Sequence, residues 1–208
     1  MFLALGGLFT AHITGNLVIV AAHYVSGGFG QIGPILAVPV FIAVLGVLTQ
    51  VFAALGPRRH GRRRPLLLLH AGLIAACLGL GVGFGPFADV DGTLAVLVGM
   101  LGVAAMATQN ALVRLAVPGA PSTAAMTTNI TQVTVDVATV VWNRAAPDHV
   151  VAARRRAGVT LPCVVGFIGG CAIGAVLEVH AGLWALALPA VLAVLAVALG
   201  ELGGDQDG

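Results

Sequence analysis

The sequence predicts an all-α integral membrane protein, a polytopic bundle of about six or seven transmembrane helices, and three observations support this prediction. Of its 208 residues, 59% are apolar and only 9% are charged, whereas roughly a quarter of the residues of a soluble domain are charged. The apolar residues gather in runs of about 20, the length that a helix needs to cross the hydrocarbon core. Gly, Pro and charged residues separate these runs. The composition excludes a disordered chain, and three Cys are too few for a disulfide scaffold.

Seven apolar segments follow one another along the chain. They cover about 2–25, 32–55, 66–84, 93–117, 122–142, 159–179 and 183–199. The first ends at a Ser-Gly-Gly loop, the second at a Gly-Pro pair followed by arginines, and the third at a short acidic loop. The fourth stops at Pro118-Gly119-Ala120-Pro121 and the fifth at a basic loop over 143–158, while the last two complete the membrane part. We therefore expect a single transmembrane domain over 1–208 with a short acidic tail.

Two loops rich in arginine set the expected orientation. Five Arg lie between Pro57 and Pro65, and four more lie between Arg144 and Arg156. The positive-inside rule places both loops in the cytoplasm, yet three full crossings between them would put them on opposite sides. Either one segment does not cross, or the second basic loop faces outward or lies along the interface. Segment 122–142 is the most polar and follows a Pro break, which favours a re-entrant or broken helix there.

An internal repeat is indicated by one pattern that occurs twice. Thr-Ala-x-(Ile/Met)-Thr-x-Asn-(Leu/Ile) stands at 10–17 and again at 123–130, so the two copies are separated by close to half the chain. We expect repeat halves of about 1–85 and 93–200. Repeated halves with polar, interrupted helices are typical of transporters that bind solute near the membrane midplane. The repeat is inverted if both basic loops are cytoplasmic and parallel if they are not.

Polar side chains within the apolar segments form the candidate substrate-binding set: Thr10, His12, Thr14, Asn16, Gln109, Asn110, Thr128, Asn129 and Gln132. In the first segment, His12 and Asn16 are spaced i, i+4 and are expected to share a helix face. In the fifth, Asn129, Gln132 and Asp136 are expected to form one stripe. The alternative is that the Thr and Asn side chains only hold helices together and that His12 is a satisfied buried imidazole.

Asp136 and Arg114 form the candidate proton-coupling set. A carboxylate within the fifth segment costs about 3 kcal/mol on insertion scales, so it must be protonated, paired or exposed to a wet cavity. Such a group could exchange a proton during transport, or it could stay protonated as a hydrogen-bond donor between helices. Arg114 either extends to the interface, or pairs with Asp136 or an anionic group of a ligand.

Three motifs give the chain a family resemblance. They are FTAHITGNLV at 9–18, QNA at 109–111 and MTTNITQ at 126–132. Together they resemble the YoaK-like bacterial membrane proteins, domain of unknown function 1275. The resemblance covers nearly the whole chain and implies a polytopic membrane protein, without implying an activity. Members carry further sequence ahead of the Thr-Gly-Asn motif, so we expect a preceding stretch that these 208 residues lack.

These observations favour a small-solute secondary transporter or permease, with proton coupling as one form of the mechanism. The alternative is a non-transporting membrane protein whose polar residues serve helix packing or partner binding. We expect no enzyme, metal or cofactor, because no nucleophile–base pair or metal-ligand set is recognisable, and no nucleic acid, because the arginine clusters are short loops. Abundant Ala, Val, Gly and Arg without Lys indicates a GC-rich bacterial genome and hence a multi-pass protein of the bacterial inner membrane. Its expected partners are the bilayer and a small solute, and a homo-oligomer is left open.

Overall fold

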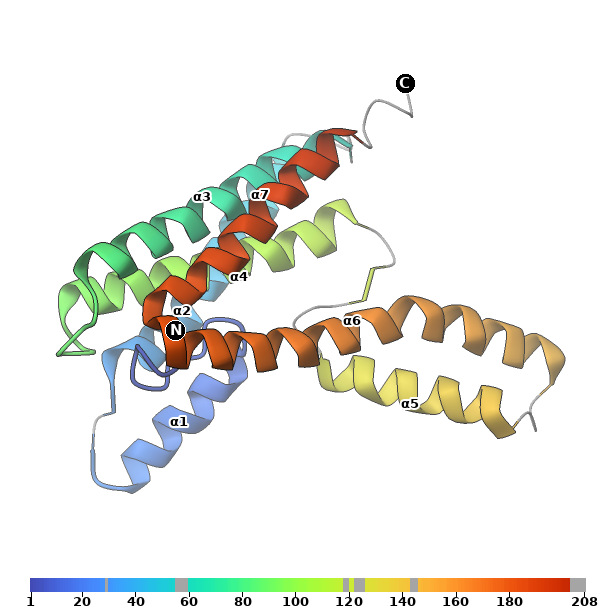
Figure 1. The fold of residues 1–208 in the computed structure, drawn as a ribbon, viewed down its shortest axis with the longest axis horizontal. Coiled ribbons are helices and arrows are strands. Elements are labelled where there is room, and N and C mark those ends of the chain that lie inside the picture. The colour runs from blue at the N-terminus through green and yellow to red at the C-terminus, as the bar shows by residue number, and fades with distance from the viewer. Residues whose placement is uncertain (29, 55–59, 118–119, 122–125, 143–145, 203–208) are drawn as a thin grey trace. The chain divides into compact units, whose positions relative to one another are not determined.

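The structure is a computed structural model, and it describes all residues except 29, 55–59, 118–119, 122–125, 143–145 and 203–208. Within the described residues, every regular element is a helix, which confirms the predicted all-α class (Figure 1). The helices are α1 (Ile13–Val25), α2 (Ile32–Ala54), α3 (His60–Phe84), α4 (Thr93–Ala116), α5 (Met126–Trp142), α6 (Pro147–Ala181), the 3₁₀-helix η1 (Gly182–Leu186) and α7 (Ala187–Leu202).

The helices have the length and apolar character of a membrane protein. Four stretches among the described residues could cross a bilayer: Ile32–Ala54, Arg63–Phe84, Thr93–Ala116 and Pro147–Leu199. The last of these contains α6, η1 and α7, and the total of six or seven spans stays a prediction. Large apolar side chains face outward along these helices, as Ile42 (64% exposed) and Val194 (60% exposed) illustrate. Such exposure is costly in water and is expected where lipid covers the surface.

Two compact units divide the chain. The first comprises Met1–Val117 and Leu177–Gly208, and the second comprises Pro118–Val176. The first unit therefore contains α1 to α4, the end of α6, η1 and α7. The second contains α5 and most of α6.

Helices α3 and α4 form an antiparallel pair in the first unit. Nδ1 of His70 lies 2.9 Å from the carbonyl oxygen of Ala105, and Sγ of Cys77 lies 3.4 Å from the carbonyl oxygen of Val98. A step forward along α3 thus matches an equal step back along α4. Small residues on α4, such as Ala105 and Ala107, are fully buried and allow this close approach.

Residues ahead of α1 pack onto α4 instead of forming a helix. Leu5 and Leu8 are buried there. A Cβ atom added to Gly99 would lie 2.6 Å from a methyl group of Leu8, and one added to Gly102 would lie 3.0 Å from Cγ2 of Thr10. The two glycines therefore provide the space that this segment fills. Our expectation of a continuous helix over 2–25 is wrong, because α1 begins only at Ile13.

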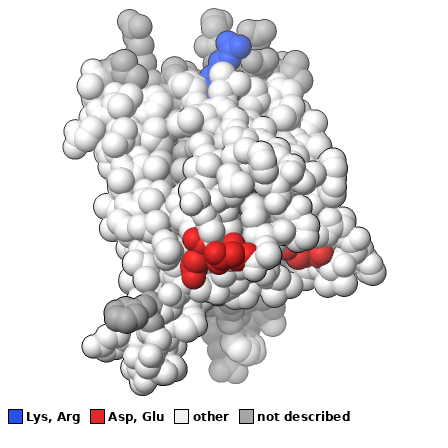
Figure 2. Space-filling model, turned by 90° about the vertical axis from the view of Figure 1, so that its left-hand side faces the viewer, with Lys and Arg blue, Asp and Glu red and all other residues white. Residues whose placement is uncertain are grey.

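Charged residues of the first unit mark the two ends of α3. Arg63 and Arg64 lie near its start, and Asp89 and Asp91 follow its end. From Arg64 to Phe84 the helix rises about 30 Å, which matches the hydrocarbon core of a bilayer. Figure 2 shows basic atoms at the top of one face and acidic atoms in its lower half, with uncharged surface between them.

The predicted boundaries are met closely in two cases and missed in another. Segments 32–55 and 93–117 correspond to α2 and α4. The predicted loop over 143–158 is wrong from Pro147 onward, because α6 already begins there. Proline is favoured at the first position of a helix and arginine is a good helix former. The arginines at 154–156 limit how much of α6 the membrane can enclose, but they do not end the helix.

Candidate functional site

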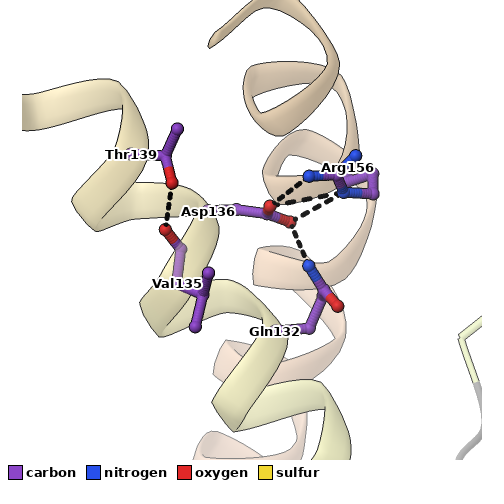
Figure 3. A network of polar contacts seen from close by, with 5 residues as sticks. All are labelled: Gln132, Val135, Asp136, Thr139 and Arg156. Carbon is purple, nitrogen blue, oxygen red and sulfur yellow. Dashed lines mark hydrogen bonds and ion pairs between the residues drawn. The ribbon is translucent and has the colours of Figure 1, made fainter. Parts of the chain in front are cut away.

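A partly buried ion pair joins α5 and α6 within the second unit (Figure 3). Asp136 on α5 is fully buried, whereas the side chain of Arg156 on α6 is 54% exposed. Nη2 of Arg156 donates to Oδ1 of Asp136 at 2.7 Å, and its Nε lies 3.3 Å from both carboxylate oxygens. Nε2 of Gln132, one turn earlier on α5, donates to Oδ2 at 3.0 Å. The carboxylate is therefore paired, which is one of the three conditions set by its place in the sequence.

Helical spacing explains why this network faces inward. Asn129, Val133 and Asp136 are the buried residues of α5, and their spacing of four and three residues places them on one face. On α6, Ala153, Thr160 and Val164 are buried with a similar spacing. Small side chains at such positions let two helices approach closely. Thr131, Thr134 and Thr139 instead bond to the carbonyl four residues earlier on their own helix.

An open cleft of about 830 Å³ lies beside the ion pair, within the second unit. Three residues of the predicted set line it, Thr128, Asn129 and Gln132. From α6 come Asp148, Arg155, Arg156 and Thr160. The cleft thus brings amide, hydroxyl and guanidinium groups together and is the strongest candidate for a solute site.

Sequence reasoning missed the contribution of α6 to this cleft. The sequence predicts a basic loop that contains Asp148, Arg155 and Arg156, and it does not single out Thr160. A signal was present, because Ala153, Thr160 and Val164 continue one helical face across the boundary placed at Gly158.

The copy of the pattern at 10–17 makes structural contacts and does not line the cleft. Asn16 is fully buried, its Oδ1 accepts a bond from the backbone N–H of Phe9 at 3.0 Å, and its Nδ2 donates to the carbonyl of Phe9 at 2.7 Å. Its amide therefore ties the non-helical stretch to the first turns of α1. Thr10 lies in that stretch, whereas Thr14 is exposed on the helix. The expected shared helix face of His12 and Asn16 is wrong, because His12 precedes the helix as its N-cap.

The candidate residues of α4 lie in the first unit. Nδ2 of Asn110 donates to the carbonyl of Met106 on its own helix at 2.8 Å, and Gln109 is partly exposed beside it. Arg114 is exposed and lies more than two turns beyond Ala105, so the antiparallel pairing puts it level with the start of α3. That position agrees with an arginine at the interface. The carboxylate of Asp136 is occupied by Arg156.

The predicted residues therefore fall into three groups. One lies around Asn16, one lies at the end of α4, and one lines the cleft on α5. Part of the second repeat pattern, residues 123–125, lies outside the described residues.

Comparison with known proteins identifies the family. A family model described as a protein of unknown function (DUF1275) matches residues 1–199. The chain belongs to the DUF1275 family. No curated protein and no solved structure matches it. Membership confirms the resemblance carried by the three motifs.

A second cleft of this DUF1275 chain, of about 520 Å³, lies in the first unit. The end of α3 and η1 line it, and most of its lining is apolar, with Phe87, Leu183 and Trp184 among the residues. None of the predicted site residues lies there. The family description supplies no activity, so the function has to be argued from the α5–α6 cleft and from the two Thr-x-Asn motifs.

Proposed function

We propose that this chain is a small-solute secondary transporter or permease of the bacterial inner membrane, built from two halves of opposite orientation. The observation that carries this proposal is the shortness of the two helices that hold the repeated motif. α1 has 13 residues and the described part of α5 has 17, whereas about 20 are needed to cross the hydrocarbon core. Short, interrupted helices at corresponding positions are typical of transporter binding sites.

The buried asparagines of the two motifs support a duplication. α1 begins at Ile13, and the described part of α5 begins at Met126. These two residues occupy the same position in the two copies of the repeated pattern. In both helices an asparagine at the fourth position is buried, Asn16 in α1 and Asn129 in α5. The two motifs thus share a buried asparagine at the same position.

The level of the ion pair supports a re-entrant α5. The uncharged part of α6, Val159 to Leu177, is long enough to cross most of the hydrocarbon core, because an α-helix rises by about 1.5 Å per residue. Arg156 precedes it by three residues, which puts the Asp136–Arg156 pair near the cytoplasmic interface rather than at the midplane. From Asp136 back to Met126, α5 extends about 15 Å, half the core thickness. A half-helix of this kind leaves both basic segments in the cytoplasm and makes the repeat inverted.

The mechanism follows from these elements. Amide and hydroxyl groups of the α5 half-helix bind the solute without covalent chemistry, and the site alternates between the two sides of the membrane. Asp136 couples the cycle to protons if its carboxylate leaves Arg156 and gains a proton in one of the two states. Non-helical backbone at membrane depth, as at a half-helix, is tolerated where protein or a water-filled cavity surrounds it.

A specific observation favours the alternative, a non-transporting membrane protein. Asp136 is satisfied by Arg156 and Gln132, and Asn16 is satisfied by the backbone of Phe9. Polar groups satisfied in this way are what helix packing alone requires.

A binding screen by thermal shift separates the two functions. The purified protein is heated with a panel of amino acids, carboxylates, phosphate esters, sugars and nucleosides, beside Asn129→Ala and Asp136→Asn. A ligand of the native state raises the melting temperature by mass action. Transport predicts a compound whose shift is lost in folded Asn129→Ala. If no compound shifts the wild type and both variants are merely destabilised, the packing alternative replaces the proposal.

A further inference from the structure

The geometry points to an oxyanion, a carboxylate or phosphoryl group, as the ligand group that the α5–α6 cleft binds, with Arg155 as its main contact. This inference rests on the proposed function and specifies the class of solute. It adds Arg155, which the sequence predicts to lie in a loop.

Arg155 and Arg156 line the same cleft but differ in their partners. Two nitrogens of Arg156 are engaged by Asp136, so its charge is largely compensated. Arg155 is exposed and forms no ion pair with any residue that the structure describes. A guanidinium offers a planar fork of donors that fits carboxylate and phosphate oxygens. The uncompensated cation of the cleft is therefore of the type suited to an oxyanion.

Uncommitted polar groups line the cleft beside it. Thr160 is only 8% exposed, and within the described part of the chain its hydroxyl forms no hydrogen bond. By contrast, Thr108, Thr131 and Thr134 each bond to the carbonyl four residues earlier. Gln132 donates one of its two side-chain N–H groups to Asp136. The hydroxyl of Thr160 is open to the cleft and is therefore available to a ligand group there.

Asp148 is the acidic residue that lines the cleft, and its negative charge is stabilised by its position in α6. It lies in the first turn of α6, where the helix dipole stabilises a negative charge. Arg155 follows two turns later, about 10 Å along the axis. The end of the cleft that holds Arg155, Thr160 and Gln132 therefore keeps its positive charge.

The test measures binding of chosen anions to the protein in phosphatidylcholine nanodiscs. The probes are succinate, inorganic phosphate and succinamide, the neutral counterpart of succinate, at constant ionic strength. The variants are Arg155→Gln and Thr160→Val. Arg154→Gln is the matched control, because Arg154 is equally exposed and does not line the cleft. We expect succinate or phosphate to bind the wild type and Arg154→Gln, and to bind Arg155→Gln about tenfold more weakly or worse.

Three results overturn the inference: neither a free anion nor phosphatidylglycerol binds, succinamide binds as well as succinate, or Arg154→Gln weakens binding as much as Arg155→Gln. A parallel set in nanodiscs with phosphatidylglycerol identifies the source of the oxyanion. Stabilisation by that lipid alone, lost in Arg155→Gln, assigns the group to a headgroup, whereas an effect of free succinate or phosphate assigns it to a solute.

Failure of the transport proposal gives a different pattern. Anion binding that depends on Arg155, without uptake into sealed vesicles, supports the oxyanion site and contradicts transport. Uptake of a neutral solute without any anion binding contradicts the oxyanion site and leaves transport in place.

Discussion

Asn16 and Asn129 occupy equivalent places in the repeated pattern, and both are buried. The sequence pointed to both residues, because an amide within an apolar segment has to find partners. It did not reveal that the partner of Asn16 is the backbone of Phe9, seven residues earlier. That contact exists only because the chain ahead of α1 is not helical, and Gly6 and Gly7, which both adopt positive φ, mark this break in the sequence. The local contact therefore depended on packing against Gly99 and Gly102 of α4.

Replacing Asn16 by Ala should lower the melting temperature of the protein in detergent. The change leaves the N–H and the carbonyl of Phe9 without partners, at about 1–3 kcal/mol for each buried group. A loss of about 2–3 kcal/mol corresponds to roughly 4–12 °C for a chain of this size. Asn110→Ala is the matched control, because Asn110 bonds only to a carbonyl of its own helix. Equal melting temperatures for the two variants would show that Asn16 does not brace this segment.

Only some of the partners of Asp136 were predictable from the sequence. Its place in a polar stripe with Asn129 and Gln132 was predictable from spacing, and Gln132 does contact it. Its cation was expected to be Arg114, if any, but the structure supplies Arg156. The difference arises from a helix boundary. The sequence predicts a loop at Arg156, whereas α6 begins at Pro147 and places Arg156 on a helix beside α5.

Among the elements, the helices whose limits coincide with those of an apolar run were predictable to within a residue or two at their ends. α2 and α4 start and stop at Gly, Pro or charged residues that also mark the membrane surface. The ends of α1 and α6 were not predictable in this way, because each helix starts at a different residue from the apolar run that it overlaps. Hydropathy reports which residues lipid tolerates, whereas helix ends are decided by caps and packing. α6 therefore begins at Pro147, although its apolar part predicted a start near Val159.

A half-helix at α5 predicts that both of its flanks are reached from the same side of the membrane. Single cysteines at Ala120 and Ala146, in a chain whose Cys77, Cys163 and Cys171 are replaced by Ala, should both react with an impermeant maleimide from the cytoplasmic side. Ala120 precedes α5 and Ala146 follows it, so a complete crossing would separate them.

Controls fix the two sides in the same experiment. Gly28→Cys, between α1 and α2, should react from the periplasmic side only, and Arg63→Cys, at the start of α3, from the cytoplasmic side only. Labelling of Ala120→Cys and Ala146→Cys from opposite sides would contradict the re-entrant α5 and the inverted repeat that depends on it.

For the whole molecule, composition alone was sufficient for the class and insufficient for the activity. A chain with 9% charged residues has few alternatives to a membrane bundle, and the apolar helices that the structure describes agree with that class. Function depends on contacts among a few polar side chains. These contacts join residues that are far apart in the sequence or that lie on different helices. The cleft beside Asp136 lies at such contacts, and an inverted pair of half-helices is the arrangement that would give it access to both sides.

Uptake into sealed vesicles tests the central claim, transport by this chain, most directly. Proteoliposomes containing wild type, Asp136→Asn or no protein are given radiolabelled succinate, phosphate, amino acids and sugars, with and without an inward proton gradient. The account predicts that at least one compound enters wild-type vesicles faster than empty ones. It also predicts that folded Asp136→Asn loses any acceleration by the gradient. If every compound enters wild-type and empty vesicles at the same rate, although the protein is folded and inserted, transport is contradicted and the polar network serves helix packing alone.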